Sequence, residues 1–272
     1  MTTAYLLVAH GSRDPRPQIA LERLAYLVGQ NLAVLKAPCL PSRGTLARVR
    51  AGYDYPHLGN GVAVLTKPAL PVLGANLECQ SLPLHGQIIQ LIQPLMDEGI
   101  TDVKIMPLFL SPGVHVCEDL PAEIHQAQER LGSRCRLIVF PYLGSLPPMV
   151  PWLEQYFQQT PSQTPSQRVL LAHGSRRPGG NMAIADLAQQ LNAQVAFWKT
   201  EPSLEVVLSQ IRCGESVVVL PYFLFAGGLT DLLQRKHPQW QRDYPGLNLN
   251  FGEPLGPNPA LARLIAEVFH RG

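Results

Sequence analysis

Apolar positions along this chain fall into short uninterrupted runs that alternate with amphipathic stretches of helical spacing. The runs have the length of strands and the stretches repeat their apolar residues every three or four positions, so the pattern predicts alternating strands and helices. Strands are expected at residues 5–9, 72–77, 102–110, 135–140, 168–172, 194–198, 216–224 and 247–251. Helices are expected at residues 15–31, 82–97, 119–131, 181–191, 203–211, 229–239 and 259–269. This alternation predicts an α/β fold with mainly parallel sheets flanked by helices.

The sequence AHGSR occurs twice, at residues 9–13 and 172–176, and each copy follows an apolar run. Such a repeat indicates two copies of one α/β unit. We therefore predict an N-terminal lobe at residues 1–146 and a C-terminal lobe at residues 168–272. Residues 147–167 are rich in Pro, Gln, Ser and Thr, which is typical of a linker. Residues 38–71 are irregular and have no counterpart in the second copy, so they are interpreted as an insertion.

Alignment of the two copies places polar residues just after strands, where ligands bind in parallel sheets. Three pairs of residues align at these positions: His10 with His173, Glu78 with Lys199, and His115 with Leu229. The first copy offers two imidazoles and a carboxylate, which suit Zn²⁺, Fe²⁺, Co²⁺ or Ni²⁺ better than Mg²⁺. Three ligands would leave coordination positions open, and the same groups could accept protons. The alignment predicts one metal and catalytic site, in the first lobe only.

These residues also have simpler explanations. His10 alone could be a polar cap of a turn, and Glu78 alone could be a solvated charge at a strand end. Because AHGSR recurs where the partner ligands are missing, part of the motif must be structural. Its glycine would form a tight turn into a helix that Ser12 and Ser175 could cap. The free N–H groups of such a turn suit an anionic ligand.

The other histidines and the cysteines are expected to take no part in the chemistry. The histidines expected at the surface are His57, His85, His125, His237 and His270. The five cysteines are scattered, without a CxxC spacing, so reduced thiols are expected. Cys117, two positions after His115, is an available extra ligand, although a buried or idle thiol is the favoured interpretation.

Composition narrows the class of protein. Hydrophobic residues make up 46% of the chain and charged residues 15%, which is typical of a globular protein. The net charge of +2 does not indicate nucleic-acid binding. No apolar window reaches the ~18 residues of a membrane span, and no signal-peptide pattern is present. We therefore expect a cytoplasmic protein without nucleic-acid or membrane partners.

Three segments carry a resemblance to a known family. They are LLVAHGSRDP at the first strand, the glutamate after the second strand, and MPLFLSPGVHVCEDLP at the third. The last one contains Pro-x-Phe-Leu, a short turn and Gly-x-His-x-x-x-Asp-Leu-Pro, between Pro107 and Pro121. Together they resemble the sirohydrochlorin chelatases, the small class II tetrapyrrole chelatases. The resemblance covers roughly residues 4–141 and 167–270, and the two-copy length resembles chains that arose by fusion of two short ones.

The resemblance implies two α/β lobes that face each other across a central cleft. It also implies ATP-independent insertion of Co²⁺ or Fe²⁺ into sirohydrochlorin, on the routes to cobalamin and sirohaem, with no permanently bound cofactor. His10 and His115 would handle the metal and protons, with Glu78 as the accessory carboxylate. The residues expected to bind this anionic tetrapyrrole are Ser12, Arg13, Ser175, Arg176 and Lys199. Because the duplication supplies an internal pseudo-dimer, a monomer is favoured.

Two other functions are compatible with parts of the sequence. A non-catalytic carrier of metal or tetrapyrrole would use the same residues to hold its cargo. A phosphatase or mutase with a histidine nucleophile would need an arginine directly before the histidine, but Ala9 and Ala172 stand there. The donor set does not choose between Co²⁺, Fe²⁺ and Ni²⁺, because their ligand preferences overlap.

Overall fold

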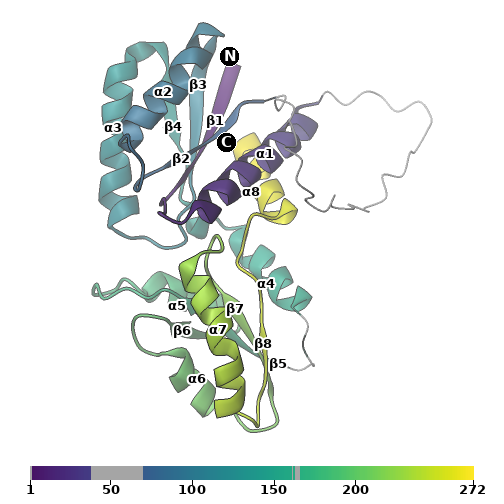
Figure 1. Cartoon of the computed structure of the whole chain (residues 1–272). Helices are drawn as coiled ribbons and strands as arrows, with labels where there is room; N and C mark the ends of the chain where they lie inside the picture. Colours follow the sequence, from purple (N-terminus) through teal and green to yellow (C-terminus); the bar gives the residue numbers. More distant parts are fainter. Residues whose placement is uncertain (1, 38–69, 161, 163–165) are drawn as a thin grey trace, which may run out of the picture.

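A computed structural model describes residues 2–37, 70–160, 162 and 166–272. These residues form two α/β lobes, which lie one above the other in Figure 1. The strands are β1 (Thr2–Ala9), β2 (Val72–Asn76), β3 (Ile100–Pro107) and β4 (Arg136–Val139) in the first lobe, and β5 (Ser166–Ala172), β6 (Gln194–Phe197), β7 (Ser216–Pro221) and β8 (Asn248–Phe251) in the second. The α-helices are α1 (Pro15–Lys36), α2 (Leu84–Asp97), α3 (Leu120–Leu131), α4 (Met149–Gln159), α5 (Met182–Gln190), α6 (Leu204–Gln210), α7 (Gly228–Asp243) and α8 (Pro259–Arg271). Short helical turns occupy His115–Asp119, Gly132–Arg134 and Leu143–Ser145.

Each lobe contains a four-stranded parallel sheet, and the two sheets have the same strand order. The order is β2-β1-β3-β4 in the first lobe and β6-β5-β7-β8 in the second. The predicted α/β fold with two homologous lobes is therefore confirmed. The paired registers also agree, because Val8 lies opposite Pro107 just as Leu171 lies opposite Pro221.

Backbone hydrogen bonds beyond the strand ends repeat the same correspondence. The Glu78 amide donates to the His10 carbonyl at 2.9 Å, and the Lys199 amide donates to the His173 carbonyl at 2.9 Å. His10 and Glu78 thus follow neighbouring strands of one sheet, as His173 and Lys199 do in the other. The structure supports aligning these residues.

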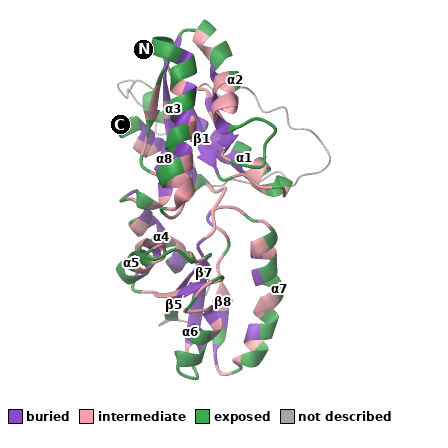
Figure 2. Cartoon of the chain, turned by 90° about the vertical axis from the view of Figure 1, so that its left-hand side faces the viewer, coloured by how far each residue is buried: buried purple, intermediate pink, exposed green. Residues whose placement is uncertain are grey.

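Three apolar clusters hold the described residues together. One lies between the first sheet and helices α2 and α3, and another lies between the second sheet and helices α6 and α7. The third runs through both lobes and includes Leu24 and Phe269 in the first and Leu153 and Leu187 in the second. In Figure 2 the strands of both lobes are mostly buried, while the outer faces of the helices are exposed.

The last helix of each repeat packs in the other lobe. Helix α8 lies along α1 in the first lobe (Figure 1). Its Phe269 ring meets Tyr5 at a centroid distance of 5.0 Å and Phe140 at 5.2 Å. Helix α4 belongs to the first repeat but contacts the second lobe, where Glu154 binds Arg168 with an Nη1–Oε2 distance of 2.7 Å. The spatial lobes therefore do not follow the order of the chain.

The predicted linker at residues 147–167 contains this helix. Met149, Trp152, Leu153 and Phe157 of α4 are all buried. Their spacing is helical, but the surrounding Pro, Gln, Ser and Thr obscure it in the sequence. Part of the segment is thus a packed element rather than a spacer.

Two of the predicted strands are shorter in the structure than in the prediction. The apolar runs at 102–110 and 216–224 were expected to be strands throughout, but strand pairing ends at Pro107 and Pro221. The apolar residues after each proline line a cavity instead.

Most of the insertion predicted at 38–71 lies outside the described residues. Among the residues that are described, no helix combines the length and apolarity required to cross a bilayer.

Candidate metal centre

Three candidate ligands come together at the carboxyl edge of the first sheet. His10 follows β1, Glu78 follows β2, and His115 begins the turn that precedes α3. One donor atom from each lies within 4.8 Å of the others. Glu78 stands between the rings, with Oε2 at 4.0 Å from His10 Nδ1 and Oε1 at 3.9 Å from His115 Nδ1.

Gly11 allows two of these ligands to approach each other. Its φ of +96° belongs to the left-handed region, which glycine adopts without the steric cost of a side chain. A Cβ atom at this position would overlap the carbonyl oxygen of Glu78. The AHG turn can therefore lie against the end of β2, and His10 and Glu78 are neighbours.

His115 lies in a π-helical turn, His115–Asp119, whose last residue contacts its ring. The distance from His115 Nδ1 to Asp119 Oδ2 is 2.8 Å. The His115 ring lies nearly perpendicular to that of His10, with centroids 4.6 Å apart. Phe109 packs near both imidazoles, with centroid distances of 6.4 and 6.5 Å.

The geometry suits a divalent transition metal. Donors bound tetrahedrally at about 2.1 Å lie roughly 3.4 Å apart, so a group whose donor atoms lie within 4.8 Å of one another needs only small side-chain rotations to bind one ion. The three side chains are partly solvent-exposed, with exposed fractions of 52% for His10, 49% for Glu78 and 34% for His115. A metal held there would keep positions open for exchange.

A cavity of about 330 Å³ lies between the lobes and meets this site. His10 and Phe109 line it from the first lobe, and His173, Ser175 and Tyr222 line it from the second. Burial raises the pKa of Tyr222, so its hydroxyl stays protonated and donates to the Leu110 carbonyl at 3.3 Å. The predicted central cleft thus has a lining from both repeats.

The described residues of the second lobe offer no equivalent donor set. His173 is exposed and its Nδ1 lies 3.1 Å from the Gly174 carbonyl oxygen. Lys199 occupies the position of Glu78, and Leu229 lies at the start of α7. Among the described residues, the group that could hold a metal is formed by first-lobe side chains alone.

Of the residues predicted to bind substrate, one lines the cavity. Ser175 lines the cavity, whereas Ser12 accepts a hydrogen bond from the Asp14 amide at 3.0 Å. Arg13, Arg176 and Lys199 are exposed. The structure does not bring these side chains into one cluster, and their substrate contacts stay predictions.

The proposed capping by the serines is wrong. Asp14 is the N-cap of α1, and its carboxylate accepts from the Arg16 amide at 3.0 Å. In the second copy, α5 begins only at Met182, because a turn follows the AHGSR motif. A helix N-terminus therefore lies close to the motif in the first lobe only.

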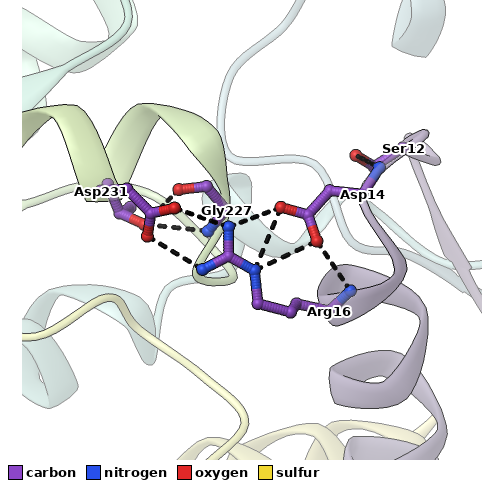
Figure 3. A network of polar contacts seen from close by, with 6 residues as sticks. Ser12, Asp14, Arg16, Gly227 and Asp231 are labelled. Carbon is purple, nitrogen blue, oxygen red and sulfur yellow. Dashed lines mark hydrogen bonds and ion pairs between the residues drawn. The ribbon is translucent and has the colours of Figure 1, made fainter.

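An ionic network joins the two lobes (Figure 3). Arg16 of α1 donates to both oxygens of Asp231 in α7, at 2.9 and 2.7 Å, and also to Asp14. These hydrogen bonds, the one with Asp231 foremost, raise the pKa of Arg16. A second, longer contact joins Arg177 to Glu118 at 4.0 Å. The segment that follows AHGSR in each repeat thus contacts a helix or helical turn of the other lobe.

One histidine prediction is wrong and another falls outside the described residues. His85 was expected at the surface, but its side chain is only 13% exposed and its Nδ1 lies 2.9 Å from Glu123 Oε2. This contact ties the start of α2 to α3. His125 is exposed as expected, His237 packs against the ring of Phe251, and His57 is not described.

Two residues that shape the site, Asp119 and Phe109, belong to the motif between Pro107 and Pro121, but sequence reasoning gave neither of them a role. Asp119 stands four positions after His115, a spacing that brings side chains together on a helical turn. Phe109 was noted as part of an apolar strand, although it ends beyond the paired register next to the ligands. Arg16 and Asp231 are 215 positions apart, and no local pattern indicates their contact.

Comparisons with known proteins agree with this architecture. The CbiX family model matches residues 74–160 and 167–271, so two copies account for most of the chain. The sirohydrochlorin cobaltochelatase of Priestia megaterium is 23% identical over 200 residues, covering 68% of this chain and 65% of that protein. The sirohydrochlorin ferrochelatase of the same organism is 27% identical over 191 residues, covering 66% and 71%.

A solved structure shows the same fold. SirB from Bacillus subtilis with Fe³⁺ superposes with a TM-score of 0.68 at 20% identity, covering 98% of this chain and 94% of that one. The match to the cobaltochelatase spans about two thirds of that relative's length. With its paired AHGSR turns, its two parallel sheets and its double match to the family model, the chain belongs to the CbiX family.

Proposed function

We propose that this protein inserts a divalent metal, Co²⁺ or Fe²⁺, into sirohydrochlorin without ATP. The observation that carries the proposal is the convergence of His10, Glu78 and His115 beside a cavity lined by both lobes. The names of the two curated relatives, a cobaltochelatase and a ferrochelatase, support the same reaction class. The metal itself is left open, because this donor set serves either ion.

The site residues have the properties that metallation requires. Insertion removes two pyrrole N–H protons while the metal exchanges its water and protein ligands for ring nitrogens. The two imidazoles and the carboxylate would hold the incoming ion without enclosing it. Glu78, within 4.0 Å of both rings, is placed to accept a proton as the ring nitrogens bind.

The second lobe would supply the other face of the substrate site. Its His173, Ser175 and Tyr222 line the cavity but complete no donor set. Exposed cations, namely Arg13, Arg176 and Lys199, would bind the carboxylates of the tetrapyrrole. Since one chain provides both faces, the active form is proposed to be a monomer.

The test is metal insertion into sirohydrochlorin, followed by absorbance with Co²⁺ and Fe²⁺ in parallel. The wild-type protein should accelerate insertion over the reaction of metal and tetrapyrrole alone, and the H115A variant should lose that acceleration. The ratio of the two rates would rank the metals.

The same assay separates the enzyme from a carrier. If the wild-type chain binds sirohydrochlorin or metal but leaves the insertion rate at the protein-free value, the chelatase proposal fails and a carrier function replaces it. If H115A retains the full rate, the assignment of the site fails while the reaction stands.

A further inference from the structure

We propose that Asp119 is a positioning residue that fixes the tautomer of His115. It would keep the proton on Nδ1, so that the unprotonated Nε2 is presented to the metal and the tetrapyrrole. The effect on catalysis rests on the proposed chelatase function, but the tautomer itself does not.

The distances decide which carboxylate takes the Nδ1 proton. Asp119 Oδ2 lies 2.8 Å from His115 Nδ1, within hydrogen-bond range, whereas Glu78 Oε1 lies 3.9 Å away, beyond it. An ionised carboxylate can only accept a hydrogen bond, so the imidazole nitrogen must donate. A neutral imidazole that donates from Nδ1 has its lone pair on Nε2.

His10 makes a comparable contact. Its Nδ1 lies 3.3 Å from the Gly11 carbonyl oxygen, which also can only accept. Both imidazoles of the site therefore have an acceptor on the Nδ1 side. Outer hydrogen bonds of this kind orient histidine ligands in metal sites.

Asp119 itself is not among the clustered donors. The group of side chains that could share one ion comprises His10, Glu78 and His115, within the residues described. Asp119 contacts the site through the ring of His115, and its backbone is held by the turn. The Leu120 amide donates to the His115 carbonyl, and Leu120 is buried in the first-lobe core. Single π-helical turns of this type are often found at functional sites.

The second lobe shows that a carboxylate here is not required by the fold. Counting along the sequence from Pro107 and Pro221, the alignment that places His115 with Leu229 places Asp119 with Leu233, which is buried in the second-lobe core. The imidazole and its carboxylate are replaced together. The α/β unit nevertheless forms with the same strand order. This joint replacement is expected if Asp119 acts through His115.

The kinetic test is a double-mutant cycle with D119A, H115A and the double variant. D119A should lower kcat for metallation about 10- to 100-fold with KM for sirohydrochlorin within about twofold, as for other residues that orient metal ligands. In the H115A background, D119A should cause no further loss. E118A is the matched control, since it removes the neighbouring acid of the same turn, and it should retain the wild-type kcat.

An additive loss in the double variant, or an equal loss in E118A, would overturn the proposal because Asp119 would then act on the fold. D119N, which keeps the shape of the side chain, serves where D119A is unstable. It should also lower kcat, since an amide can donate to Nδ1 and so favour the wrong tautomer.

Nitrogen-15 NMR of the histidine rings tests the tautomer without any activity. The His115 signals are assigned by their loss in H115A. In the wild-type chain at alkaline pH, they should show Nδ1 protonated, and in D119A the proton should move to Nε2. An Nε2-protonated ring in the wild-type protein would refute the proposal. If the chain showed no metallation at all, the chelatase function would fail while this measurement still decided the role of Asp119.

Discussion

The two lobes share one sheet topology and differ strongly in chemistry. Both have the same strand order, and both turn after AHG with a glycine in the left-handed region, at Gly11 and Gly174. In the first lobe the two neighbouring positions hold Glu78 and His115, and in the second they hold Lys199 and Leu229. The comparison teaches that the repeated motif builds a turn. The donors that surround one copy of that turn create the metal site.

The sharpest test of this comparison pairs equivalent histidines. H10A should lower the metallation rate by about 10²- to 10⁴-fold, the range expected for loss of a group that handles protons or metal. H173A should retain the rate within about threefold, because the residues that the structure describes place no donor set around His173. Absorbance-monitored insertion measures both. Equal losses in the two variants would mean that both lobes carry catalytic groups.

The exchanged helices predict the next largest effect. Phe269 is fully buried, so F269A should lower the free energy of unfolding by about 3–5 kcal/mol. Although Phe269 ends the second repeat, the loss should appear in the first lobe, where its ring meets Tyr5 and Phe140. Hydrogen exchange combined with denaturant unfolding would show which lobe loses stability.

The matched variant is F157A, from the last helix of the first repeat. Phe157 lies under the guanidinium of Arg168, so its loss should raise exchange in the second lobe. If each variant instead raised hydrogen exchange in the lobe of its own repeat, the packing of α4 and α8 in the opposite lobes would be refuted.

The two turn glycines sharpen the comparison further. G11A should cost about 1–3 kcal/mol of backbone strain and also reduce metal affinity, because the new Cβ would displace the backbone of Glu78. In G174A the nearest atoms belong to side chains, those of Thr200 and Phe197. Cobalt titration should therefore show weaker binding for G11A and unchanged binding for G174A, with similar losses of stability.

The smallest effect concerns the charge that replaced a carboxylate. K199E should weaken sirohydrochlorin binding about two- to fivefold, as expected for one exposed charge. R212E makes the same charge change in the same lobe, but Arg212 precedes β7 at the opposite edge of the sheet. The R212E variant should therefore bind sirohydrochlorin with wild-type affinity. Fluorescence titration at low salt would compare them. Equal affinities for K199E and wild type would remove Lys199 from the substrate site.

The sequence was sufficient to predict the α/β order and the convergence of His10, Glu78 and His115. His10 and Glu78 follow apolar strands, and His115 follows the short turn after a third, and in a parallel sheet those strand ends meet at one edge. Comparison of the two repeats then showed which residues form the shared turn and which residues, found in the first lobe alone, are the candidate metal donors. These inferences succeed because they depend on local pattern and on one general property of parallel sheets.

The remaining features depend on contacts that local pattern does not encode. The amphipathic pattern of α8 indicates that one face is buried, but not which sheet covers it. The pairing of Arg16 with Asp231 likewise depends on how the lobes meet. The burial of His85 requires Glu123 from another helix. The contact between His115 and Asp119 is different, because its four-residue spacing was visible in the sequence.

The crossing of α4 and α8 has a consequence for synthesis on the ribosome. Chains emerge from the N-terminus, and N-terminal units generally fold first. Here the first sheet cannot gain the cover of α8 until Pro259–Arg271, which follows the strands of the second repeat, has been made. The first lobe to be translated would thus complete its core only after the second repeat has been made, with one apolar face open to chaperones until then.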